Sequence, residues 1–170
     1  MRKILPILFV AAAATFTLSA CNKNEQKPAE AAAEQKPDTV PLPTDPSDKT
    51  AWRKYLSTVV TNNMQGVKST RPYMYFVPAG DDEAAQNDRA NQLDNVKTTV
   101  ARGVLPGNMM AFGGPDSAKT SALVVDAFKD AQPGSFKDVV VMFVGSAADG
   151  ETVKQGLAAS GADVRIVEAK

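Results

Sequence analysis

Apolar side chains recur along residues 51–170 with two alternating spacings. Steps of three and four residues are typical of amphipathic helices, and short continuous apolar runs are typical of buried strands. The two patterns follow each other four times, in the order αβαβαβαβ. This alternation, with connections of ordinary length, predicts an α/β fold: an open, mostly parallel four-stranded sheet with helices on both faces.

In the first half of this region, prolines and acidic residues mark where the elements begin and end. The first helix is expected over residues 46–66, the first strand over 73–77, and the second helix from 81 to just before Pro106. The acidic residues at 81–83 favour a helix start because carboxylates are stabilised at the positive end of the helix dipole. The aromatic residues expected in the core are Trp52, Tyr73, Tyr75 and Phe76.

The second half repeats the pattern around its most apolar strand, residues 138–145. A short strand is expected from residue 108, a helix from the following glycine loop to about residue 131, and a further helix over 149–160. Residues 162–168 return as the last strand. The inner stripe expected on the third helix is Ala118, Ala122, Val125 and Phe128.

The three strand-to-helix loops, residues 78–84, 113–120 and 145–152, each combine glycine with Asp or Ser at a helix start. Glycine lets a ligand approach the backbone, and the free amides of a helix start can bind an anion. Because the carboxyl ends of parallel strands meet at one edge of the sheet, we expect the loops to converge there. The candidate ligand-binding residues are Gly80, Asp81, Gly113, Gly114, Asp116, Ser117, Gly145 and Ser146.

These loops have a second interpretation that needs no ligand. Asp81, Asp116 and Asp149 are residues of the kind that commonly caps helices, and glycine is common in turns. Both interpretations stay open at this point.

The segment 113–120, GGPDSAKT, is close to the Walker A phosphate loop, because Gly113, Lys119 and Thr120 match that pattern. Ala118 stands where the pattern requires a glycine, and Pro115 removes one amide donor from the loop. The sequence therefore predicts a strand-to-helix turn here, and it predicts no nucleoside triphosphate as a partner.

The composition excludes several chemistries. The chain has no histidine and one cysteine, which removes histidine-dependent triads, disulfides and most transition-metal sites. The residues Asp81, Asp82 and Glu83 lack the ligand spacing of a calcium loop. We therefore assign no catalytic residue, no metal site and no cofactor. Basic and acidic side chains number 19 each, so nothing favours nucleic acid as a partner.

The first 20 residues have the organisation of an export signal peptide. A basic start, Met1 to Lys3, precedes an uncharged apolar region that closes on small residues at 19 and 20. The alternative is a transmembrane anchor, but the uncharged stretch 4–20 is short for a span and contains Pro6.

The closing residues Leu18-Ser19-Ala20-Cys21 resemble the lipobox of bacterial lipoproteins, and Cys21 is the only cysteine in the chain. The resemblance implies cleavage before Cys21 and attachment of diacylglycerol to its sulfur, followed by acylation of the new amino terminus. Several acyl chains would hold the protein at a membrane essentially permanently. The family's sorting rule, applied to Asn22, implies the outer membrane and a periplasmic position.

Residues 21–50 have the composition of a disordered, lipidated linker that leads to a single domain, residues 51–170. The linker is rich in proline and repeats Glu-Gln-Lys-Pro, and its large apolar residues are Val40 and Leu42. Treated as a flexible coil, it spans about 30 Å.

These features together favour a lipid-anchored envelope protein whose domain binds or scaffolds another component, with the membrane and an envelope protein as partners. A histidine-free hydrolase or transferase that uses the loop edge is one alternative. An inhibitor or immunity lipoprotein is another, and an exposed apolar patch is expected of it.

Overall fold

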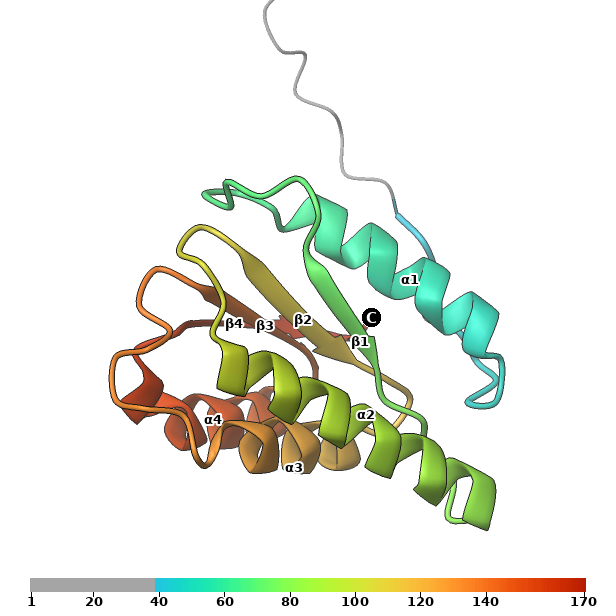
Figure 1. The fold of residues 1–170 in the computed structure, drawn as a ribbon. Helices are drawn as coiled ribbons and strands as arrows, with labels where there is room; N and C mark the ends of the chain where they lie inside the picture. The colour runs from blue at the N-terminus through green and yellow to red at the C-terminus, as the bar shows by residue number, and fades with distance from the viewer. Residues whose placement is uncertain (1–38) are drawn as a thin grey trace, which may run out of the picture. The chain divides into compact units, whose positions relative to one another are not determined.

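The computed structural model of this chain describes residues 39–170. The predicted signal peptide, Cys21 and the linker up to residue 38 lie outside the described residues. The helices and strands follow the predicted order (Figure 1). They are α1 (Lys49–Asn62), β1 (Tyr73–Phe76), α2 (Glu83–Arg102), β2 (Met109–Gly113), α3 (Ser117–Phe128), β3 (Val140–Gly145), α4 (Ala147–Gly156), the short 3-10 helix η1 (Ala158–Ser160) and β4 (Asp163–Glu168).

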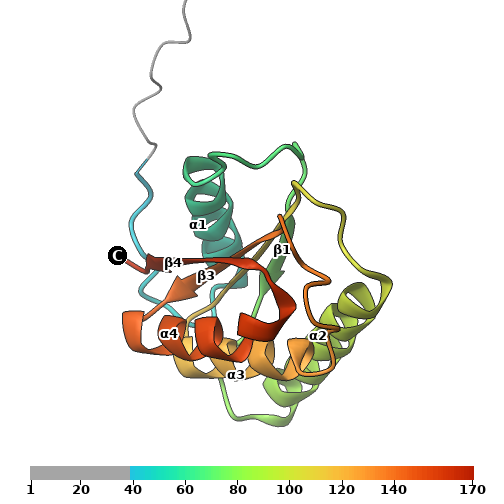
Figure 2. The ribbon, with the colours of Figure 1, turned by 90° about the vertical axis from the view of Figure 1, so that its left-hand side faces the viewer.

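Within residues 39–170 the strands form one sheet in the order β1-β2-β3-β4, and every neighbouring pair is parallel. The predicted α/β fold class is thus confirmed. Each connection steps one strand in the same direction, and such crossovers are almost always right-handed. The helices α2, α3 and α4 consequently lie on one face of the sheet, and α1 lies on the other (Figures 1 and 2).

Each face of the sheet carries its own apolar cluster in the described part of the chain. All residues of β2 and β3 are buried, as expected of central parallel strands covered on both faces. On the side of α2, α3 and α4, the rings of Phe112 and Phe143 lie in the core. On the other side, Trp52, Tyr55, Leu56 and Val60 of α1 pack with Met109, Ala111, Val140, Met142 and Val144.

The inner face of α3 differs from the expected stripe. Ala118 and Ala122 are exposed and Val125 is half-buried, whereas Phe128 is buried as expected. Two polar residues, Thr120 and Ser121, are buried instead. Their hydroxyls donate to the carbonyls of Asp116 and Asp149, at 2.8 and 3.1 Å, which removes the cost of burying them. The residues buried on α3 are Thr120, Ser121, Leu123, Val124, Ala127 and Phe128.

The expectation that all four aromatic residues lie in the core was wrong for Tyr73. Its side chain is 44% exposed, because β1 is an edge strand with a neighbour on one side only. Trp52 and Phe76 are buried. Tyr75 is half-buried; its ring stacks on Phe112 and its hydroxyl hydrogen-bonds to Thr99 at 3.1 Å.

Residues 39–48, which the composition places in the linker, lie against the domain. Val40 packs on the α1-side cluster, and the Trp52 indole N–H donates to the Asp45 carbonyl at 3.1 Å. The Asp45 carboxylate accepts from the Ser47 amide and hydroxyl, and Asp48 caps α1 by accepting from the Ala51 amide. No helix in residues 39–170 has the length and apolar character needed to cross a membrane.

Candidate functional site

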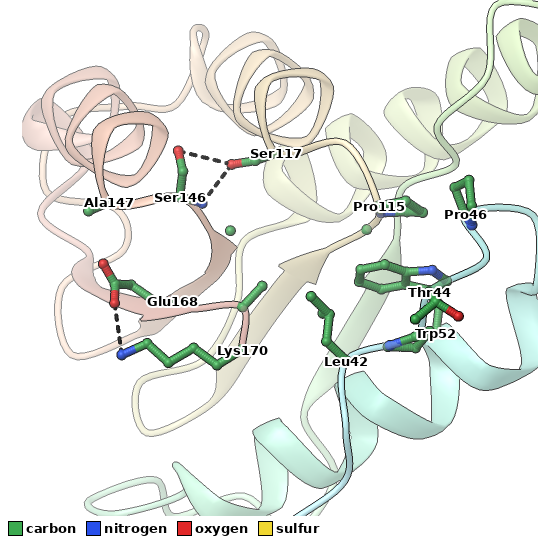
Figure 3. A pocket seen from close by; sticks show the side chains of 14 residues that line it. Leu42, Thr44, Pro46, Trp52, Pro115, Ser117, Ser146, Ala147, Glu168 and Lys170 are labelled. Carbon is green, nitrogen blue, oxygen red and sulfur yellow. Dashed lines mark hydrogen bonds and ion pairs between the residues drawn. The ribbon is translucent and has the colours of Figure 1, made fainter.

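A cleft of about 660 Å³ lies at the carboxyl edge of the sheet, where β2, β3 and β4 end (Figure 3). We call it the carboxyl-edge cleft. One wall comes from the loops that follow β2 and β3, one from the end of β4, and one from residues 42–46 with Trp52 of α1. Its lining residues are Leu42, Pro43, Thr44, Pro46, Trp52, Gly114, Pro115, Ser117, Gly145, Ser146, Ala147, Glu168, Ala169 and Lys170.

The structure brings half of the sequence-predicted candidates to this cleft: Gly114, Ser117, Gly145 and Ser146. Gly113 is buried in β2 and faces α1. Asp116, Gly80 and Asp81 do not line the cleft. They belong to a separate group of contacts around Lys119.

The β1–α2 loop does not line the cleft, because its carbonyl groups and Asp81 bind the side chains of Arg89 and Lys119. The Arg89 guanidinium donates from Nη1 to the carbonyls of Pro78, Ala79 and Gly80, at 3.1, 2.6 and 2.6 Å. The Lys119 ammonium lies 2.7 Å from the Asp81 carboxylate and hydrogen-bonds to the Gly80 carbonyl at 3.4 Å. Its hydrogen bond and charge lower the pKa of Asp81, and the same contact raises the pKa of Lys119.

The Walker-like segment forms a short turn. Only residues 114–116 separate β2 from α3, and Ala118 and Lys119 lie in the first turn of the helix. Asp116 caps α3 by accepting from the Lys119 amide at 2.9 Å, which confirms the expected cap. Since the Lys119 ammonium is paired with Asp81, it is not directed at a phosphate position in this loop.

The two glycines of this segment are required by packing. A Cβ on Gly113 would overlap the Leu56 side chain of α1, and a Cβ on Gly114 would overlap the carbonyl oxygen of Val77. The close approach of β2 to α1 and to the end of β1 therefore explains both glycines without a bound ligand.

A hydrogen-bonded group of Ser117, Ser146 and Asp149 joins the starts of α3 and α4 beside the cleft. Figure 3 shows the contact between Ser117 and Ser146. The Ser146 amide donates to Ser117 Oγ at 2.8 Å, and the Ser146 hydroxyl donates to Asp149 Oδ2 at 2.7 Å. In return, the Asp149 amide donates to Ser146 Oγ at 3.2 Å. Ser146 is therefore the cap of α4, and the expected cap Asp149 is not. The cap of α2 also differs from the expected one, because Asp82 occupies that position in place of Asp81.

The sequence contains a signal for this group, although Asp149 was not among the candidate ligand-binding residues. Ser146 and Asp149 have the three-residue spacing of a capping box, in which an acidic side chain returns to the capping residue. Hydrogen bonds from Ser117 and Ser146 lower the pKa of Asp149. The carboxylate is consequently charged at neutral pH and is a weak base toward the Ser146 hydroxyl.

The remaining walls were missed because they do not belong to strand-to-helix loops. Leu42, Trp52 and the Glu168–Lys170 ion pair, 2.9 Å between charged atoms, all line the cleft. The end of β4 could have been predicted as part of the cleft, because the carboxyl ends of parallel strands meet at one edge of the sheet. No local pattern marks Leu42 or Trp52 as cleft residues, because their place depends on how residues 39–48 fold back.

The carboxyl-edge cleft can hold a small polar molecule with an apolar part. Ser117 and Ser146 offer hydroxyls on one side, while Leu42, Pro46 and Trp52 offer an apolar surface on the other. In residues 39–170 no three acidic, histidine or cysteine side chains are placed to hold a metal ion. Every buried side-chain polar atom in this range has a hydrogen-bond partner.

Comparisons with protein-family models, curated protein sequences and solved structures found no significant match to this chain.

Proposed function

We propose that this protein is a lipid-anchored component of the bacterial cell envelope whose α/β domain acts as a binding or scaffolding module. The observation that carries the proposal is Leu18-Ser19-Ala20-Cys21 at the end of a complete export peptide, with Cys21 the only cysteine of the chain. Lipid on Cys21 would hold the protein at a membrane without a transmembrane helix. Asn22 favours the outer membrane, with the domain facing the periplasm.

Replacing Cys21 tests the anchor. In the native host, Cys21→Ala is expected to abolish labelling by radioactive palmitate and to move the protein from the membrane to the soluble periplasmic fraction. Unchanged labelling would show that the lipid is not on Cys21 and would overturn the proposal. Asn22→Asp tests the destination, because it should keep the label and shift the protein toward the inner membrane.

The binding role is supported by the carboxyl-edge cleft, whose lining includes the exposed side chain of Leu42. A photo-crosslinking amino acid at Leu42 is expected to give a discrete crosslinked product in intact cells. The matched control is Lys154 of α4, which is exposed and does not line the cleft. Equal product patterns from both positions, or none from Leu42, would count against a binding role for this cleft.

One observation supports a second candidate, a hydrolase or transferase without histidine. The Ser146 hydroxyl donates to the Asp149 carboxylate at 2.7 Å beside the cleft, as a nucleophile does to its base. The lowered pKa of Asp149 and the capping role of both residues favour the binding module instead.

A fluorophosphonate probe separates the two candidates. Labelling of the wild-type protein that is lost in both Ser146→Ala and Asp149→Asn would favour the enzyme. The binding module predicts no labelling of any of the three proteins. Circular dichroism shows whether each variant has kept its fold.

A further inference from the structure

A second cleft, of about 630 Å³, lies at the amino edge of the sheet, where the chain enters the strands. We call it the amino-edge cleft. It is formed by the turns before β1, β2, β3 and β4, and none of the sequence-predicted candidates lines it. Its charged lining residues are Lys68, Lys137, Asp138, Asp163 and Arg165.

The charges in this cleft do not cancel. Asp163 accepts from Nε and Nη2 of Arg165, at 3.2 and 3.1 Å, so these two form a pair. Among the described residues, neither Lys68 nor Lys137 has an ion-pair partner, and Asp138 has none either. Beside the Arg165–Asp163 pair, the cleft thus has two lysines and one aspartate, which leaves it with one net positive charge.

The helix dipole does not account for the two lysines. Cations are stabilised in the last turn of a helix. The last turns of α1 and α3 contain no basic residue, and Lys68 and Lys137 lie several residues beyond the ends of these helices.

The Arg165 guanidinium is held by four hydrogen bonds, and one of its N–H groups has no acceptor in residues 39–170. A guanidinium has five N–H groups. Two donate to Asp163, and Nη1 donates to the carbonyls of Asn63 and Gln65, at 3.3 and 2.7 Å. In residues 39–170 the fifth N–H, on Nη2, has no acceptor. Gly66 and Arg165 both line the cleft, and a Cβ on Gly66 would meet Nη2 at 3.7 Å, an ordinary contact distance.

We propose that the amino-edge cleft binds a small oxyanion of the phosphate class. Lys68 and Lys137 supply charge, and the free N–H of Arg165 supplies a directional donor. A phosphate carries up to two charges and several acceptor oxygens, so it matches two ammonium groups and a guanidinium better than a carboxylate does. Asp138 opposes binding and limits its strength. Neither the lipid anchor nor the carboxyl-edge cleft is needed for this binding.

The site is tested with the full-length protein, labelled with nitrogen-15 in non-ionic detergent and titrated with sodium phosphate at low ionic strength. The amides of Gly66, Gly107 and Gly161 are expected to shift saturably, with a Kd on the order of 1 mM. Acetate at equal ionic strength should shift them less.

Charge variants decide whether the cleft is the site. Lys68→Gln and Lys137→Gln should each weaken binding by roughly two- to fivefold, as expected for exposed charge pairs. Asp138→Asn should strengthen binding by a similar factor, because it removes the opposing charge. The matched control is Lys54→Gln on α1, an exposed lysine away from the cleft, which should bind as the wild type does.

Three results would overturn the proposal: no saturable shift at the three glycine amides, an equal effect of Lys54→Gln and Lys68→Gln, or weaker binding by Asp138→Asn. The source of the phosphate is distinguished by comparing glycerol phosphate with monomeric dihexanoyl phosphatidylglycerol. Tighter binding of the lipid assigns a membrane headgroup, and equal or weaker binding of the lipid assigns a free phosphorylated molecule.

Discussion

Asp149 is the acidic residue whose surroundings give the clearest prediction about pH. Hydrogen bonds from Ser117 and Ser146 lower its pKa below the ordinary value of 3.8. Because the folded protein binds this proton less readily than the unfolded chain, the group stabilises the fold above pH 3.8. This stabilisation is lost as the pH falls through the lower pKa of the folded state.

We therefore expect the free energy of unfolding to fall less between pH 6 and pH 3 in Asp149→Asn than in the wild type. Urea denaturation at both pH values measures this difference. Ser146→Ala should show the same trend, since it removes one donor to the carboxylate. Thr58→Ala, which removes a hydroxyl bonded to the Lys54 carbonyl, should keep the wild-type response. An identical acid response in wild type and Asp149→Asn would contradict the prediction.

At the scale of elements, the contact between α1 and β2 depends on one glycine. Leu56 of α1 occupies the space that a Cβ on Gly113 would need. Gly113→Ala should therefore cost about 1–3 kcal/mol of stability, as overpacking does. Leu56→Ala alone should cost about 2–5 kcal/mol, because it leaves a cavity under the helix.

The double variant is the decisive measurement. In the Leu56→Ala background, Gly113→Ala should cost less than it does in the wild type, because the overlapping side chain is gone. Some cost should remain, since the Val144 Cβ would lie 3.1 Å from the new methyl group. Chemical denaturation of all four proteins gives the coupling energy. Strict additivity would show that Leu56 does not set the need for glycine at this position.

The helices and strands could be predicted from the sequence, because the apolar residues of each one recur with the spacing of that type of secondary structure. The buried stripe of α3 could not be predicted, because Thr120 and Ser121 are buried through hydrogen bonds to carbonyl groups, one of them in the neighbouring helix α4. Local apolar spacing contains no information about such partners. Tyr73 was misplaced for a related reason: its strand looks buried in sequence, but its position at the sheet edge is a property of the whole sheet.

At the scale of the whole molecule, the strand order explains why the candidate site was only partly predicted. In open sheets whose order reverses, helices diverge at the reversal and leave a crevice. The order β1-β2-β3-β4 has no reversal among the described strands. One wall of the carboxyl-edge cleft comes instead from residues 42–46, and this proline-containing segment, with Leu42 as its one large apolar residue, gives no periodic signal.

The contribution of this segment can be measured by comparing chains that begin at residues 39 and 47. The shorter chain loses the packing of Val40 and the hydrogen bond between Trp52 and the Asp45 carbonyl. Its free energy of unfolding should be lower by about 1–3 kcal/mol, from a partly buried valine and one hydrogen bond. A chain that begins at residue 38 serves as the control. Equal stability of all three would show that residues 39–46 do not belong to the folded unit.

The attachment of residues 39–48 also determines how this domain would respond to a mechanical load applied through the chain before residue 39. The load would first reach Val40 and the hydrogen bond from Trp52 to the Asp45 carbonyl, and next α1, which precedes the sheet in the chain. Separation of α1 from the sheet would uncover the face on which Trp52, Tyr55, Leu56 and Val60 pack. The uncovered face would then present the apolar side chains of Met109, Met142 and Val144 to solvent, so that a load could create a new apolar surface.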